Sequence, residues 1–174
     1  MAQSINMGVS EKTKSFFETR VTKEGTHYMA VHGDIEITGF TTSKTKAVVE
    51  RLVKASLDSP KEVPPNVATL ADRLSSYVEE AITQFNSDYV SLSMSLRAGE
   101  AKMTLSVYLT YYSDDKITEW RGIAEALVEW RNERREVRHV VKRRVRFTDN
   151  VSGFAIYRQL MDVARRAYAI VVNE

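Results

Sequence analysis

The sequence contains no cysteine, and its apolar residues nowhere form a long uninterrupted run. Without cysteine there are no disulfides, thiolate metal ligands or nucleophilic thiols, which fits a reducing compartment. No segment approaches the roughly 20 apolar residues that a membrane-spanning helix needs. The first seven residues also lack the charged and apolar regions of a signal peptide. We therefore expect a soluble, cytoplasmic protein that makes no contact with a membrane.

Proline is scarce too, and all three prolines lie between Ser59 and Pro65. Because proline lacks an N–H donor and restricts the residue before it, this stretch separates two helical segments. The 174 residues are enough for one domain with its own core. We expect a loose arm over residues 1–14 and a single α+β domain over residues 15–174, whose two halves would be 15–87 and 88–174.

Sequence motifs for catalysis and for metal binding are also missing. The chain has no glycine-rich phosphate loop, no nucleophile elbow and no HExxH pattern. His32, Asp34 and Glu36 share one parity of an expected strand and are residue types that bind divalent ions. No helical or loop ligand pair supports them, so an ordinary solvent-facing strand explains them better. The sequence therefore predicts a non-enzymatic protein with no metal site and no cofactor.

The strongest pattern that the sequence does have is strict alternation between Val90 and Tyr112. Apolar residues occupy every second position from Val90 to Leu96 and again from Met103 to Tyr111. Side chains alternate across a strand, so this pattern predicts two strands with one buried face and one polar face. A short connection that contains Gly99 makes the two strands a hairpin.

The rest of the chain predicts a second hairpin and four helices. The hairpin consists of strands over residues 16–22 and 27–40, with Gly33 and Gly39 as candidate bulges. Apolar residues recur at helical spacing in four segments: from a cap at Ser43 to residue 57, from a cap at Asn66 to residue 85, over 117–130 and over 156–171. The order ββααββαα predicts a two-layer α+β fold, in which an antiparallel sheet from two β-hairpins carries four amphipathic helices on one face.

Residues 137–147 fit two interpretations. As a helix, Val137, Val141 and Val145 continue the apolar stripe of the segment before them. As a fifth strand, the same three valines share a face that His139 and Arg143 interrupt. No glycine or proline separates these residues from the preceding helical pattern. We therefore expect the helix to continue through Val141, with the strand as the alternative.

Basic residues concentrate between Arg131 and Arg146, where eight basic residues accompany only two acidic ones. On a helix, one stripe runs along a single face: Arg131, Arg135, Arg138, Lys142 and Arg146. Three further arginines add to the positive field: Arg134, Arg143 and Arg144. On a strand, one face carries four basic residues: Arg138, Lys142, Arg144 and Arg146. Both arrangements place like charges together, so the segment needs an external anion or acidic neighbours.

The polar face of the hairpin over residues 90–112 is the second candidate surface. Tyr108 and Tyr112 stand there among serine and threonine residues, with Lys102 at one end. Exposed aromatic side chains on a sheet can stack unpaired nucleic-acid bases. The same composition also suits an ordinary solvent-facing sheet or the packing face of a homo-oligomer.

These patterns predict a binding protein that contacts the phosphate backbone of DNA or RNA, without sequence readout, through residues 131–146. The alternative is a structural or adaptor protein, for example a viral component or an inhibitor, that works through a homo-oligomeric or protein-partner interface. Free and contiguous arginines would favour nucleic acid as the partner. Buried or acid-paired arginines would favour assembly.

Overall fold

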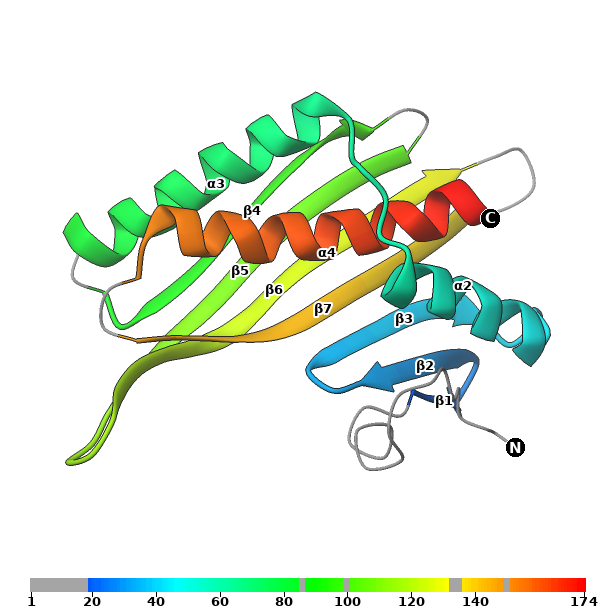
Figure 1. The fold of residues 1–174 in the computed structure, drawn as a ribbon, viewed down its shortest axis with the longest axis horizontal. Coiled ribbons are helices and arrows are strands. Elements are labelled where there is room, and N and C mark those ends of the chain that lie inside the picture. The colour runs from blue at the N-terminus through cyan, green and yellow to red at the C-terminus, as the bar shows by residue number, and fades with distance from the viewer. Residues whose placement is uncertain (1–18, 85–86, 99–100, 132–135, 149–150) are drawn as a thin grey trace.

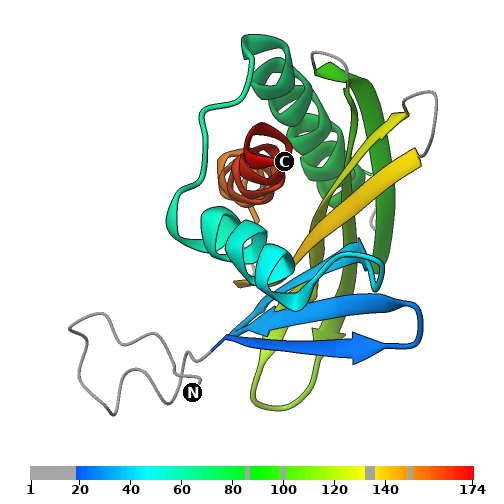
Figure 2. The same cartoon turned by 90° about the vertical axis from the view of Figure 1, so that its right-hand side faces the viewer.

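The computed structural model describes residues 19–84, 87–98, 101–131, 136–148 and 151–174. Its strands are β1 (Arg20–Glu24), β2 (His27–His32), β3 (Ile35–Thr41), β4 (Tyr89–Ala98), β5 (Ala101–Ser113), β6 (Thr118–Arg131) and β7 (Glu136–Thr148). Its helices are α2 (Lys46–Asp58), α3 (Pro65–Gln84) and α4 (Gly153–Asn173). The seven strands form one antiparallel sheet in the order β1-β2-β3-β7-β6-β5-β4. All three helices lie on the same face of this sheet (Figures 1 and 2).

The predicted α+β class and the antiparallel sheet with helices on one face are confirmed, whereas the predicted order of elements is wrong. The described elements follow one another as βββααββββα, with three helices and not four. β3 pairs with β7, so both halves of the chain contribute to the same sheet. None of the described helices has the length and apolar character needed to cross a membrane.

The hairpin predicted over residues 90–112 is present as β4 and β5. Its register pairs Val90 with Leu109 and Leu96 with Met103, in agreement with the alternation. Met103, Leu105 and Leu109 are fully buried beneath the helices, because their parity faces the core. The buried and polar faces of the hairpin are therefore as predicted.

The third predicted helix is wrong, because residues 118–131 form β6. Apolar residues lie on both faces of this strand: Ala124, Ala126 and Val128 are buried under the helices, while Ile123 and Leu127 are half-buried on the other face. Together the two sets imitate a helical period. Gly122 is unfavourable in the interior of a helix. In β6 it lies so close to β5 that a Cβ there would collide with the carbonyl of Tyr108.

The prediction that a helix continues through Val141 is also wrong, and the strand alternative is the one observed. β7 pairs with β6 without interruption from Glu119 opposite Thr148 to Arg131 opposite Glu136. Because strand neighbours bury one parity, Val141 is fully buried and Val137 and Val145 are nearly so.

The long strand predicted over residues 27–40 is in fact a hairpin. Gly33 adopts a φ of 61°, a left-handed conformation that favours glycine, and the chain reverses there between β2 and β3. The register of β2 and β3 shifts between Tyr28 and Met29, which makes Gly39 the predicted bulge. Residues 1–18, which include the expected arm over residues 1–14 and the expected start of the first strand, lie outside the described residues.

The two helices that flank the prolines are confirmed, but their first residues differ from the prediction. Thr45, and not Ser43, caps α2, because its side chain accepts a hydrogen bond from the backbone of Val48. α3 begins at Pro65, a residue suited to the first helical turn, so Asn66 lies inside the helix. The last helix is confirmed as α4, which begins after the cap Ser152.

Candidate nucleic-acid interface

One face of the sheet, opposite the helices, is left uncovered by any described element, and we call it the open face (Figure 2). The residues of β7 that point there have the parity opposite to its buried valines. They include four of the predicted basic residues: Arg138, Lys142, Arg144 and Arg146. The predicted strand arrangement of these four residues on one face is therefore confirmed.

The polar side of β5 belongs to the same open face, because β6 lies directly between β5 and β7. Across these strands, Tyr108 stands opposite Ile123, which stands opposite Arg144. Neighbouring strands are about 4.8 Å apart, so the backbones of Tyr108 on β5 and Arg144 on β7 are about 10 Å apart. The two surfaces that the sequence suggested separately thus form one surface.

The tyrosines and arginines concentrate near the end of the open face where β5 finishes and β6 begins. We call this group the Tyr–Arg end: Tyr108, Tyr112, Arg121, Arg144 and Arg146. Two of its members, Arg121 and Arg146, are opposite one another on β6 and β7. Arg121 and Tyr89 were not among the predicted site residues. Tyr89 pairs with Thr110 on the same face and is exposed. Tyr89 is two residues before Ser91, so the alternation of the hairpin could have placed it on the polar face.

A buried acid orients two of the three arginines of the Tyr–Arg end. Glu119 is only 4% exposed, and its two carboxylate oxygens bind different arginines. Arg121 donates hydrogen bonds to Oε1 through Nε and Nη2, at 2.9 and 2.6 Å, and Arg146 forms an ion pair in which its Nε lies 2.8 Å from Oε2. The guanidinium carbon of Arg121 also lies 4.9 Å from the ring centre of Tyr112. Because each guanidinium has five N–H donors, both arginines retain donors for an external anion.

At the opposite end of the open face, charges of the two signs alternate across the strands. Lys102 stands opposite Glu129, which stands opposite Arg138. Lys142 likewise lies between Glu125 on β6 and Glu36 on β3. Within the part of the chain that the structure describes, neither Arg138 nor Lys142 forms an ion pair or side-chain hydrogen bond. These two cations therefore have acidic neighbours but no fixed partner.

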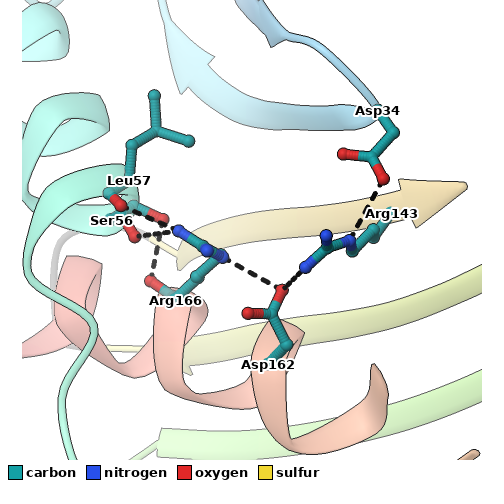
Figure 3. Close-up of polar contacts among 6 residues, drawn as sticks. All are labelled: Asp34, Ser56, Leu57, Arg143, Asp162 and Arg166. Carbon is teal, nitrogen blue, oxygen red and sulfur yellow. Dashed lines mark hydrogen bonds and ion pairs between the residues drawn. The ribbon is translucent and has the colours of Figure 1, made fainter. Parts of the chain in front are cut away.

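Arg143 lies on the other face of β7 and belongs to a network beneath the helices (Figure 3). It donates to Asp162 at 2.7 Å and to Asp34 at 3.2 Å. Asp162 also binds Arg166, which donates to the last carbonyls of α2, those of Ser56 and Leu57. Burial lowers the pKa of Arg143, but Asp162 and Asp34 outweigh it and raise this pKa above its usual value. Arg143 thus joins β7 to α4 and to the turn between β2 and β3.

His139, the other residue that interrupted the valine face, lies on the same side of β7 and is fully buried. Its Nε2 lies 3.0 Å from Oε2 of Glu174, whose Oε1 binds Lys44 at 2.9 Å. Burial raises the pKa of Glu174, but the hydrogen bonds to His139 and Lys44 lower it overall to about 2. A cavity of about 600 Å³ opens beside these residues, between β3 and β7, and His139 and Lys44 contribute to its lining.

The remaining predicted residues of the basic segment are not brought into one stripe. Arg131 ends β6 and pairs with Glu136 of β7, so the continuous helical stripe from Arg131 to Arg146 is wrong. Arg134 and Arg135 lie outside the described residues.

The premise that His32, Asp34 and Glu36 share a face is also wrong, because a turn separates them. His32 pairs with Ile35 on the helix side, while Glu36 pairs with Lys142 on the open face. Burial is the main reason that the pKa of His32 is lowered, and its Nδ1 lies 2.9 Å from Oγ1 of Thr19. Among the described residues, no three histidine or acidic side chains gather closely enough to hold a metal ion.

Comparison of the chain with protein-family models, with curated proteins and with solved structures finds no match. The chemistry of the open face is therefore the basis for a functional assignment. That face combines exposed phenol rings, which can stack on planar groups, with oriented guanidinium groups, which can hold phosphates.

Proposed function

We propose that the protein is a non-enzymatic nucleic-acid-binding protein that holds a single strand of DNA or RNA across its open face. The observation that carries this proposal is the Tyr–Arg end, where Tyr112 and two oriented arginines, Arg121 and Arg146, lie together. Tyr112 is 47% exposed and Tyr108 is half-buried, so a base can reach the ring of Tyr112 most easily. The arginines on β6 and β7 would hold the phosphates that follow this base.

The charge of the open face agrees with this use. From Lys102 to Arg146, six basic and three acidic described side chains of β5, β6 and β7 point there, which leaves a net positive charge. On β7, which lies next to the acidic residues of β6, three of the basic side chains are exposed to solvent: Arg138, Arg144 and Arg146. Phosphate contacts of this kind do not depend on base identity, so binding would not depend on sequence.

A titration with a labelled single-stranded oligonucleotide and with a duplex of the same sequence tests the proposal. We expect the single strand to bind more tightly, because only unpaired bases can stack on Tyr112. Tyr112→Ala should weaken single-strand binding about 5- to 150-fold, as loss of one stacked base does, and should leave duplex binding nearly unchanged. Phe154→Ala on α4, which removes an exposed aromatic side chain from the helix side, is the matched control.

A protein interface is the second candidate, and the apolar strip in the middle of the open face favours it. Ile123, Leu127 and Val140 are half-buried there although no described element covers them. The alternating charges of Lys102, Glu129 and Arg138 would suit a complementary protein surface. If the wild type binds neither oligonucleotide at low salt, this second function replaces the first.

A further inference from the structure

β4 forms one edge of the sheet, so the backbone N–H and C=O groups of every second residue point away from β5. The N–H of Tyr89 donates to Oγ of Ser87 at 3.2 Å, and this hydroxyl donates to the carbonyl of Tyr89 at 2.7 Å. On the inner side, the carbonyl of Asp88 accepts a hydrogen bond from the N–H of Tyr111. Because backbone groups alternate along a strand, the odd-numbered residues of β4 direct theirs outward.

At the two ends of this edge the outward backbone groups have hydrogen-bond partners, whereas in the middle they have none among the described residues. Oγ of Ser87 binds both outward backbone groups of Tyr89, and Nδ2 of Asn66 donates to the carbonyl of Arg97 at 3.0 Å. Between them, Ser91, Ser93 and Ser95 direct three N–H and three C=O groups outward. No described residue lies beyond β4 in the sheet to pair with these groups.

β4 also lacks the features that protect edge strands from pairing. No charged residue and no proline occurs from Tyr89 to Leu96, and its register with β5 is continuous. The opposite edge, β1, is only five residues long and exposes three charged side chains: Arg20, Lys23 and Glu24. Short, charged edges discourage pairing, whereas long, uncharged, regular edges invite it.

We propose that β4 pairs with β4 of a second copy of the chain, antiparallel, with Ser93 on the two-fold axis. Ser93 then exchanges two hydrogen bonds with Ser93 of the second copy, and Ser91 exchanges two with Ser95 on each side of the axis. In this register the outward N–H and C=O groups of all three serines are satisfied on both copies. A shift by two residues would place a serine opposite Tyr89 or Arg97, whose carbonyls already have partners.

The side chains at this edge fit the same register. Leu92 and Met94 are half-buried on the helix side, and the pairing brings Leu92 opposite Met94 of the second copy. Tyr77 of α3 is 50% exposed and lies eleven residues from Asn66, three helical turns along the flank that reaches β4. Since the two-fold axis is perpendicular to the sheet, the helices of both copies lie on one face, and Tyr77 faces the second copy. This inference does not depend on nucleic-acid binding.

Sedimentation equilibrium of the full chain and of two variants at position 93 tests the pairing. Ser93→Pro removes an outward N–H without breaking a bond to β5, so it should raise the dimer dissociation constant at least about tenfold. Ser93→Ala loses the same hydroxyl contact, 2.7 Å to Oγ of Ser106, but keeps the N–H and should remain dimeric. Circular dichroism should show that both variants remain folded.

A cysteine cross-link tests the register without any need for proline to be tolerated. The chain has no cysteine, so Ser93→Cys introduces a single thiol. Hydrogen-bonded partners in an antiparallel pair have Cα atoms about 5.5 Å apart, within disulfide range, so mild oxidation should give a covalent dimer. Thr22→Cys on the exposed edge β1 is the control and should stay monomeric under denaturing conditions.

Three results would overturn the proposal. If the wild type is monomeric at high concentration, β4 does not pair with a second copy, and its edge would be available to an extended segment of another protein. An open, concentration-dependent series of oligomers would indicate head-to-tail pairing of β4 with β1. A dimer that survives Ser93→Pro and does not cross-link through Ser93→Cys would have its interface elsewhere.

Discussion

Arg143 and Arg144 are adjacent in the chain, yet they face opposite sides of the sheet and have different surroundings. Arg143 is held by Asp162 and Asp34 beneath the helices. Arg144 is exposed on the open face, where, among the described residues, its side chain donates only to the carbonyl of Gly33, at 3.3 Å. Substitution of Arg143 should therefore affect mainly the stability of the fold, and substitution of Arg144 should affect mainly binding.

We expect Arg143→Ala to lower the free energy of unfolding by about 1–3 kcal/mol, because it leaves Asp162 and Asp34 without a shared partner. The value is below that for a fully buried pair because Arg143 is partly solvated. Arg144→Ala should change stability by less than about 0.5 kcal/mol and should weaken oligonucleotide binding instead. Urea unfolding and an oligonucleotide titration of both variants measure the two effects. Equal stability losses would contradict the assignment of these residues to opposite faces.

Glu174 gives stability a dependence on acid. Its pKa in the folded protein is about 2, below the ordinary value of 4.5, so the folded state binds this proton less readily than the unfolded chain. The stabilisation is complete above pH 5 or so and is lost as the pH falls toward about 2, with a total of at most about 3 kcal/mol. Glu174→Gln should be less stable at pH 7 and should show a shallower loss in urea unfolding between pH 5 and 3. Parallel curves for the two proteins would contradict this linkage.

At the scale of elements, β6 is where the structure departs most from the sequence-based interpretation, and Gly122 makes the difference measurable. In a helix, Gly122→Ala would stabilise the protein by up to about 1 kcal/mol. In β6 a Cβ at this position would collide with the backbone of Tyr108, which cannot move without disturbing β5. We therefore expect a loss of about 1–3 kcal/mol or more in urea unfolding. A stabilised Gly122→Ala variant would favour the helix.

The elements that could be predicted from sequence were those with one clean period. The alternation of β4 and β5 and the apolar stripes of α2, α3 and α4 each have a single buried face, so one period fits and the competing one does not. β6 and β7 lie in the middle of the sheet and carry apolar residues on both faces, which blurs period two. In β7, His139 and Arg143 broke the alternation because both have acidic partners inside the fold, Glu174 and Asp162.

The candidate site could be predicted only in part, for a related reason. The four basic residues of β7 shared a face in the strand interpretation, and the tyrosines of β5 shared a face by their own alternation. Their union on one surface depends on the strand order, which places β6 between β5 and β7. Glu119, which orients Arg121 and Arg146, comes from that same strand and was hidden by the helical interpretation of residues 117–130.

At the scale of the whole molecule, the uneven distribution of charge matters more than its total. The formal net charge is only +2, but basic side chains outnumber acidic ones on the open face. A polyanion that follows this face would displace counterions in proportion to the number of phosphates neutralised. The dependence of affinity on salt therefore reports how many of these cations are in contact with the strand.

We expect the double variant Arg138→Ala/Lys142→Ala to flatten the plot of log affinity against log salt concentration for a single strand by about 1.4, or two phosphate contacts. The same charge change on the helix side, Lys54→Ala/Arg73→Ala, should leave the slope nearly unchanged, because both of these residues are exposed on helices that cover the opposite face. Melting curves must show that both variants are folded, since arginine and lysine stems also cover apolar surface. Equal flattening by the two double variants would mean that the strand responds to net charge alone. An unchanged slope in Arg138→Ala/Lys142→Ala would confine the contact to the Tyr–Arg end, where Arg144 and Arg146 remain.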